Sequence, residues 1–377
     1  MNNKIFISFF ILLGLISCKK EQADIQLMNA KDFTTTIDGK AVSLYTLNSG
    51  NGIHMQVTNF GGRVVSLWTA DKNGRFEDIV LGHKTIEEYV DNQGERFIGC
   101  VVGRYANRIA NGQFEIDGTV YNVPKNNNGQ SLHGGLKGLD MVVWDVDKVS
   151  ENEIQLSYIS PDGEEGYPGT LKINMIYTLT PDNEFKITYN AVTDKPTVVN
   201  LSHHGFFNLK GEGKGTINDH VLTINADYIT PINEVLIPTG KLMPVENTPF
   251  DFRKATVIGD RVNDENEQLK NAIGYDHNWV LNKKIENAIE FAASVYEPMS
   301  GRYMEVWTDQ PAMQFYGGNF FNGKGDGKYG ATYNYRESLA LETQKFPDSP
   351  NQPNFPSTRL NPGEVYTHTC IYLFSVK

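Results

Sequence analysis

The chain has 377 residues and a formal net charge of −11, with 35 glycines and 11% aromatic residues. This length suits one large domain or two smaller ones, and the glycine and aromatic content favours strands joined by turns over helical bundles. The negative charge argues against a nucleic-acid partner, because phosphates would be repelled. A neutral small molecule is therefore the expected partner.

The N-terminal segment is predicted to lie outside the folded domain. Lys4 supplies a positive start, residues 5–16 form an apolar run, and Cys18 follows directly. The run is too short for a permanent membrane span and is typical of a bacterial lipoprotein signal, with an ordinary secretion signal as the alternative. We therefore expect a signal over 1–18 with lipid on Cys18, a polar tether over 19–32, and an exported protein anchored in the cell envelope.

Strand-like runs recur from residue 33 to the C-terminus, and turn dipeptides such as Asn73-Gly74 and Asp117-Gly118 separate them. Strands are predicted over 53–60, 64–69, 113–116, 154–159, 171–180, 185–191, 221–226, 288–295 and 303–307. Helical periodicity is weak, and only 85–90 and 260–271 predict short helices. The pattern indicates a single all-β domain over 33–377, an antiparallel β-sandwich of two packed sheets.

Two cysteines remain beyond the predicted signal, Cys100 and Cys370, and both lie in apolar, strand-like surroundings. One disulfide and two buried free thiols are both compatible with this pattern. The spacing does not resemble a zinc site.

Glu342 interrupts an apolar, strand-like run near the C-terminus. Alternation places it on the face of Ala340 and Gln344, opposite Leu341 and Thr343. Burial disfavours a charged carboxylate, so such a residue is either salt-bridged within the sheet or used in function.

Arg108 and His133 lie in two further polar segments. Arg108 follows Asn107 in a bend after an apolar strand, and its guanidinium is suited to sugar or carboxylate oxygens; a surface arginine is the alternative. His133 precedes two glycines, which allow a ligand to approach the backbone, although turn histidines often have no role.

Adjacent histidines and an acidic residue among aromatics complete the candidates. His203 and His204 lie on a strand, so at most one of them faces a given pocket. Asp276 is flanked by Tyr275 and Trp279, whose rings either stack on sugar C–H groups or belong to the core.

Together these segments resemble the galactose mutarotase (aldose 1-epimerase) family over residues 33–377. The motifs that support the resemblance are Asn107-Arg108-Ile109, Ser131-Leu132-His133-Gly134-Gly135, Asp162–Gly169, Asn200–Leu209, Tyr275-Asp276-His277-Asn278, Gln314–Asn319 and Leu341-Glu342-Thr343-Gln344. The chain departs from the family where His203 stands in place of a frequent Asn, and in its exported start.

The resemblance implies a role for each matching residue. Glu342 corresponds to the catalytic base and His204 to the catalytic acid, and the implied sugar-binding residues are Arg108, Asn107, His133, Asp276 and Gln314. The implied activity interconverts α and β anomers of free glucose or galactose. No redox cofactor or metal is implied; a structural calcium ion remains open, although no EF-hand pattern is present. A monomer is expected.

This chemistry requires a base at the C1 hydroxyl and an acid at the ring oxygen, each contributing roughly 10²–10⁴-fold. For Glu342 to be ionised and His204 protonated, the attraction between the two charges has to offset the cost of burying them. Two alternatives remain: a glycoside hydrolase with Glu342 and Asp276 as its carboxylate pair, and a non-catalytic carbohydrate-binding protein. A hexose-phosphate substrate is disfavoured, since no extra Arg/Lys cluster is present.

Overall fold

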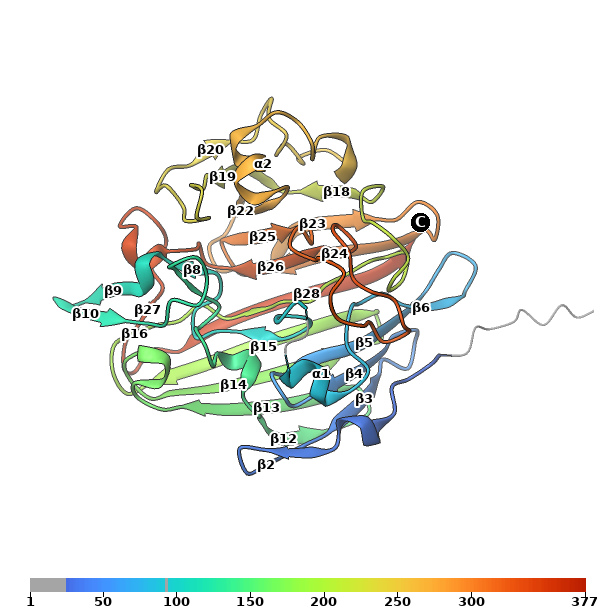
Figure 1. The fold of residues 1–377 in the computed structure, drawn as a ribbon, viewed down its shortest axis with the longest axis horizontal. Coiled ribbons are helices and arrows are strands. Elements are labelled where there is room, and N and C mark those ends of the chain that lie inside the picture. The colour runs from blue at the N-terminus through green and yellow to red at the C-terminus, as the bar shows by residue number, and fades with distance from the viewer. Residues whose placement is uncertain (1–24, 92–93) are drawn as a thin grey trace, which may run out of the picture.

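The computed structural model describes residues 25–91 and 94–377. Its regular structure is almost entirely β-strand, arranged in three larger sheets and several two-stranded ladders (Figure 1). The ladders of the larger sheets are antiparallel, which confirms the predicted all-β class. Among the described residues, no helix is long and apolar enough to cross a membrane.

The largest sheet has nine strands. In spatial order they are β12 (Asp145–Val149), β13 (Glu153–Ser160), β14 (Leu171–Leu179), β15 (Glu184–Thr193), β28 (Tyr366–Val376), β24 (Arg302–Thr308), β23 (Glu290–Tyr296), β18 (Val221–Ile224) and β21 (Thr256–Val257). The C-terminal strand β28 lies in the middle of this sheet, so the last residues of the chain are needed to join its two halves (Figure 1).

Two smaller sheets pack with the large one. The five-stranded sheet contains β20 (Met243–Pro244), β19 (Ala226–Thr230), β22 (Asp276–Leu281), β25 (Ala312–Tyr316) and β26 (Ala340–Gln344), and the four-stranded sheet contains β3 (Leu44–Asn48), β4 (His54–Thr58), β5 (Arg63–Ala70) and β6 (Phe76–Asp78). One contiguous core includes Tyr177 of β14, Leu67 of β5 and Phe315 of β25. The hydrophobic core therefore lies between the nine-stranded sheet and both smaller sheets.

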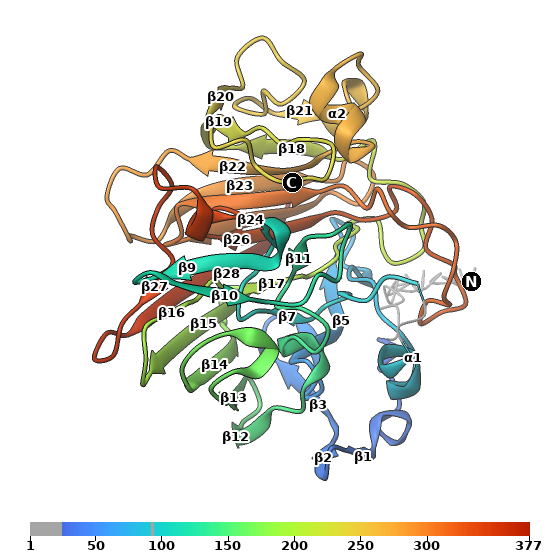
Figure 2. The same ribbon diagram turned by 60° about the vertical axis from the view of Figure 1, so that its left-hand side comes forward.

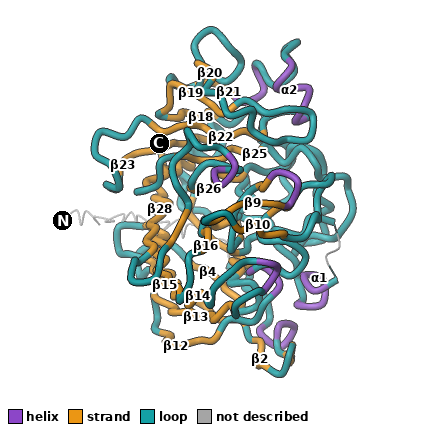
Figure 3. Tube along the Cα trace, turned by 90° about the vertical axis from the view of Figure 1, so that its left-hand side faces the viewer, coloured by secondary structure: helices purple, strands orange, loops and turns teal. Residues whose placement is uncertain are grey.

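The remaining elements are short. The two-stranded ladders are β1 (Thr35–Ile37) with β2 (Lys40–Val42), β7 (Val101–Val102) with β17 (Ser202–His203), β8 (Arg108–Ile109) with β11 (Ser131–Leu132), β9 (Gln113–Ile116) with β10 (Thr119–Asn122), and β16 (Thr197–Val198) with β27 (Arg359–Leu360). The helices are α1 (Ile86–Val90), α2 (Glu267–Ala272) and the 3-10 turns Ala30–Phe33, Ala110–Gly112, Leu139–Met141, Glu164–Gly166, Ile258–Asp260 and Ser349–Asn351. Figure 3 shows α1 and α2 among long loops on one side of the molecule, with most strands on the other.

Two predicted elements differ from the structure. The predicted strand 221–226 is divided at Asn225, because the chain there passes from β18 in one sheet to β19 in another, and Asn225 N–H donates to Ala292 O (2.8 Å). The predicted helix 260–271 is shorter, since Asn266 accepts the Gln268 N–H (2.9 Å) and so starts α2 at Glu267.

The predicted tether is partly outside the described residues and partly packed on the domain. Met28 N–H donates to Gln56 Oε1 (2.7 Å), and Gln56 Nε2 donates back to Met28 O (3.0 Å). The chain is thus held to β4 before residue 33, where we had placed the start of the domain. The predicted signal over 1–18 lies outside the described residues.

Cys100 and Cys370 are free thiols and both are buried. Burial raises the pKa of both thiols, that of Cys370 to about 12. They belong to the apolar interior as small side chains.

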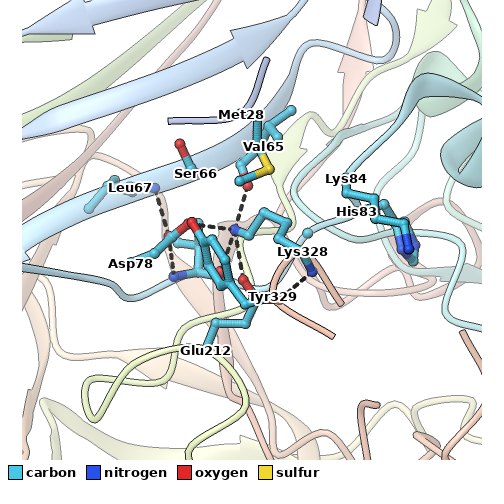
Figure 4. Close-up of polar contacts among 12 residues, drawn as sticks. Met28, Val65, Ser66, Leu67, Asp78, His83, Lys84, Glu212, Lys328 and Tyr329 are labelled. Atoms are coloured by element: carbon cyan, nitrogen blue, oxygen red, sulfur yellow. Dashed lines mark hydrogen bonds and ion pairs between the residues drawn. The ribbon is translucent and has the colours of Figure 1, made fainter. Parts of the chain in front are cut away.

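A buried ion cluster fixes the loop that joins β25 to β26. Lys328 Nζ has no exposed surface and lies 2.8 Å from Asp78 Oδ2 and 3.1 Å from Glu212 Oε2 (Figure 4). It also donates to Val65 O at 2.6 Å and to Val80 O at 2.8 Å. Burial opposes the Lys328 charge, but both carboxylates act to raise its pKa.

Lys328→Met is expected to lower the free energy of unfolding by about 3–5 kcal/mol, because it leaves two buried carboxyl groups without their cation. Chemical denaturation monitored by tryptophan fluorescence measures this. Lys324→Met changes an exposed lysine of the same loop and is expected to stay within about 0.5 kcal/mol of the parent protein. Equal effects of the two substitutions would contradict a stabilising role for the cluster.

Candidate active site

A pocket of about 230 Å³ gathers most of the predicted site residues. Its walls are formed by Glu95, Phe97, Asn107, Arg108, Asn127, Asn128, Leu132, His133, His204, Leu236, Asp276, Tyr316, Phe320 and Glu342. These residues come from the five-stranded sheet and its loops, from the segment between α1 and β11, and from the end of β17. Figure 2 shows β11 close to β26. Of the seven predicted site residues, Gln314 does not line the pocket.

The five-stranded sheet supplies two of the pocket's carboxylates, Asp276 and Glu342. Asp276 of β22 pairs with Tyr316 of β25, and Gln314 of β25 pairs with Glu342 of β26. Directly paired residues of antiparallel strands project to the same side, as do residues two positions apart. These four side chains therefore share one face, while Phe315 and Leu341 on the other face enter the core. This confirms the predicted placement of Glu342 opposite Leu341.

His204 reaches the pocket from the residue after β17. Its N–H donates to Cys100 O (2.8 Å), and its carbonyl accepts from Gly99 N–H (3.0 Å). The His203 ring instead packs among Tyr177 and Phe185 in the core. This confirms the prediction that the two histidines face opposite sides.

His133 and Arg108 are positioned by the β8–β11 ladder, in which Leu132 pairs with Arg108. His133 N–H donates to Asn107 O (3.1 Å), and Asn107 N–H donates to His133 Nδ1 (3.0 Å). Because Nδ1 accepts this bond, the ring hydrogen of neutral His133 is on Nε2. Burial lowers the pKa of His133 well below its usual value, and the charges of His204 and Arg108 lower it further.

Arg108 and Asp276 form the charged floor of the pocket. Arg108 Nη1 lies 3.8 Å from Asp276 Oδ2, and Arg108 Nε donates to Asn127 Oδ1 (3.4 Å). Burial raises the pKa of Asp276, while Arg108 and a hydrogen bond from Gln314 oppose this shift.

Gln314 does not line the pocket itself but contacts one of its carboxylates. Its Nε2 donates to Asp276 Oδ1 at 2.6 Å, and its side chain is buried behind that carboxylate. Gln314 lies on the same sheet face as Asp276 and Glu342. Gln314 thus orients Asp276, and its predicted contact with the sugar stays a prediction.

Glu342 and His204 form a close acid–base pair, with Glu342 Oε1 3.4 Å from His204 Nε2. Glu342 is 2% exposed and His204 is 4% exposed. Glu342 Oε2 has no hydrogen-bond partner among the described residues. Burial raises the pKa of Glu342 well above its usual value, the nearby Asp276 charge adds to this, and Arg108 opposes it. Burial lowers the pKa of His204 to about 3.

These shifts correct the expected charge state of the pair. We expected an ionised Glu342 and a protonated His204, but desolvation favours the neutral form of both groups, with the single shared proton on Glu342. The neutral and ion-paired forms contain the same number of protons and differ only by transfer between the two groups. The site can therefore both accept and donate one proton.

His133, His204 and Glu342 also place three potential metal-ligating atoms within 4.8 Å of one another. The hydrogen bond from Asn107 N–H occupies the lone pair of His133 Nδ1, which leaves Nε2 as a proton donor. A metal would therefore require a different state of His133. The donor set fits hydrogen bonding to a neutral ligand better than metal coordination.

Several wall residues were not found from the sequence. Tyr316 was within reach of the alternation argument, because it is two residues from Gln314 on the same strand. Glu95 and Phe320 lie in loops without periodicity, and nothing local marks them. Arg104, the other arginine of its segment, points away and donates to Ser160 Oγ (2.7 Å) and Gly169 O (2.8 Å), so it fixes the 160–169 loop.

A larger groove of about 930 Å³ lies elsewhere and shares no residue with this pocket. Two of the cationic side chains that line it already bind other groups of the protein. Lys345 Nζ donates to Ser357 O (2.6 Å), and Arg359 pairs with Asp117 (2.7 Å). The smaller pocket contains the converging acid, base and hydrogen-bonding groups expected of an active site.

Comparison with known proteins gives consistent results. The aldose 1-epimerase family matches residues 43–373. The chain is 44% identical over 338 residues to galactose mutarotase of Rattus norvegicus, covering 90% of this chain and 95% of the rat protein. It is 35% identical over 339 residues to aldose 1-epimerase of Escherichia coli K12, covering 89% and 96%. A solved aldose epimerase homologue from C. elegans superposes with a TM-score of 0.82 at 30% identity, covering 89% and 99%.

Proposed function

Since the chain belongs to the aldose 1-epimerase family, we propose that its pocket interconverts the α and β anomers of free glucose or galactose, with Glu342 and His204 as the acid–base pair. The protein is an isomerase acting on a sugar. The single observation that supports this assignment of roles is the 3.4 Å approach of His204 Nε2 to Glu342 Oε1 inside the pocket.

The reaction moves two protons without net consumption. Glu342, as the base, takes the proton of the C1 hydroxyl, and His204, as the acid, gives a proton to the ring oxygen. The bond between C1 and the ring oxygen breaks, which yields the open-chain aldehyde. Rotation about C1–C2 and the reverse transfers then close the ring on the other face.

Binding of the sugar produces the charge state of the acid–base pair that the reaction needs. Without a bound sugar, burial keeps the shared proton on Glu342. Transfer of this proton to His204 must therefore accompany binding of the sugar. Hydroxyl groups that donate to Glu342 stabilise its ionised form, and a ring oxygen that accepts from His204 stabilises the protonated imidazole. Arg108, Asp276, Asn107 and the Nε2–H of His133 hold the ring so that both reacting atoms meet the pair.

These steps need neither a metal nor a redox cofactor, because ring opening and closure leave the oxidation state of C1 unchanged and the acid–base pair supplies both proton transfers. The tautomer imposed on His133 by Asn107 favours hydrogen bonding at this site. A structural calcium ion elsewhere remains compatible with the proposal. We further propose a monomer as the active unit.

Polarimetry of freshly dissolved α-D-glucose and α-D-galactose tests the proposed activity. The purified protein is expected to accelerate the approach to anomeric equilibrium of at least one of them. A chromogenic glycoside should stay unhydrolysed, which separates this activity from that of a glycoside hydrolase. A protein that binds the sugars but leaves both rates unchanged would be a carbohydrate-binding protein instead.

We also propose that the protein is exported and anchored by lipid on Cys18. Support comes from the sequence: Lys4, the apolar run over 5–16 and the cysteine that ends it. Metabolic labelling with radioactive palmitate should mark the membrane-bound protein, and Cys18→Ala should abolish the label. Labelling that persists in Cys18→Ala would place the lipid elsewhere.

A further inference from the structure

Glu95 is a third carboxylate in the wall of the pocket, besides Asp276 and Glu342. It is half-buried, and its carboxylate is held by backbone N–H groups of the next two residues, with Phe97 N–H 3.2 Å from Oε1. The adjacent cation does not neutralise it, because Arg96 binds Asp140 instead, with Nε 2.7 Å from Oδ2. Glu95 thus faces the pocket without a cationic partner among the described residues.

The surroundings make this carboxylate costly in the empty pocket. Burial raises the pKa of Glu95, and the Asp276 charge raises it further. Glu95 in turn contributes to the raised pKa of Glu342. A half-buried carboxylate near two other carboxyl groups is unfavourable unless a donor meets it, and sugar hydroxyls are donors.

The other two carboxylates of the pocket already have side-chain partners. Asp276 receives Gln314 Nε2 on Oδ1 and faces Arg108 on Oδ2. Glu342 faces His204, which assigns it to the anomeric centre. Glu95 is therefore the pocket carboxylate with neither a cationic partner nor a side-chain hydrogen bond among the described residues, and it is not assigned to the anomeric centre.

We propose that Glu95 accepts a hydrogen bond from a ring hydroxyl of the sugar other than the one on C1, and that it thereby sets which aldoses the enzyme selects. This inference rests on the proposed function of the pocket. A carboxylate held by the backbone at a fixed position discriminates between an equatorial and an axial hydroxyl, because only one of them reaches it with good geometry.

Deoxy sugars provide the test. For Glu95→Ala, kcat/KM for the better of glucose and galactose is expected to fall about 10- to 100-fold, mainly through KM, the usual contribution of a hydrogen bond to a charged group. One member of the 2-, 3-, 4- and 6-deoxy series should be converted equally well by the parent enzyme and Glu95→Ala, because its missing hydroxyl is the partner. Glu87→Ala, an exposed glutamate of α1 outside the pocket, should match the parent enzyme throughout.

A purely structural role for Glu95 predicts a different pattern. If Glu95 only held Phe97, whose ring lies 4.6 Å from that of His133, every deoxy sugar would lose the same factor as its parent sugar in Glu95→Ala. Glu95→Gln keeps an acceptor for Phe97 N–H, so in that case it would restore full activity. Uniform losses, or full rescue by Gln, would overturn the proposal.

A ring-locked sugar separates this inference from the proposed function. The 1,5-anhydro derivative of the preferred sugar has no anomeric hydroxyl and cannot open, so it reports binding alone. Its Kd, measured by calorimetry, is expected to rise about 10- to 100-fold in Glu95→Ala. An unchanged Kd, with normal mutarotation by the parent enzyme, defeats only the inference, whereas a parent enzyme that fails to accelerate mutarotation defeats the proposed function.

Discussion

Glu342→Gln is expected to lower kcat for anomer exchange by about 10²–10⁴-fold. The amide has nearly the shape of the carboxyl group but cannot take the proton of the C1 hydroxyl. Folding should be preserved, because burial already disfavours the charged form of Glu342 and a neutral amide avoids that cost. Polarimetry measures the rate, and thermal unfolding verifies the fold.

Glu87→Gln, the same substitution at an exposed position of α1, serves as the matched control and should leave both readouts unchanged. Near-normal activity of folded Glu342→Gln would move the base to another group of the pocket, of which Asp276 and Glu95 are the remaining carboxylates.

His204→Gln is the second substitution with a large expected effect, again about 10²–10⁴-fold in kcat. The amide can still contact the ring oxygen, but it cannot deliver a proton to it. A glycoside hydrolase that used Glu342 and Asp276 would tolerate this change far better. The matched control is His203→Asn, which changes a ring in the core that does not line the pocket, and its rate should stay within a few-fold of the parent.

The pH profile distinguishes a coupled pair from two independent groups. Activity requires one shared proton, so it should be lost as pH falls through the His204 pKa of about 3, where both groups become protonated. It should also be lost as pH rises through the raised pKa of Glu342, where both become deprotonated. In His204→Gln the acidic limb should disappear, and the double variant should be little slower than either single one, since the two residues act as a unit.

Local sequence was sufficient for much of the fold. The predicted strand 113–116 coincides with β9, and Leu171–Leu179 of β14 falls within the predicted 171–180. These strands alternate clearly between buried and exposed residues, so a two-residue period identifies them. The prediction of one strand over 221–226 was wrong, because this apolar segment contributes to two sheets. The hydrogen bonds around Asn225 show where it divides.

The charge states of the site residues and the contacts of their side chains depend on which distant segments pack together. The sequence placed Glu342 on a strand face but did not show how far packing removes Glu342 and His204 from water. We expected both groups to be charged, whereas burial favours the neutral form of each. Gln314 illustrates the same limit: the resemblance implied a sugar-binding role, and only the structure shows that its side chain donates a hydrogen bond to Asp276.

The sequence by itself determined the all-β class, the family and the residue types of the acid–base pair, because side-chain alternation and family motifs are local properties. Only the tertiary structure decided that His204 lies 3.4 Å from Glu342, that His203 faces the core, and that Glu95 joins the pocket wall. Those outcomes depend on contacts between residues far apart in the chain and on the water that those contacts exclude. Both are properties of the packed molecule, which no single strand or loop contains.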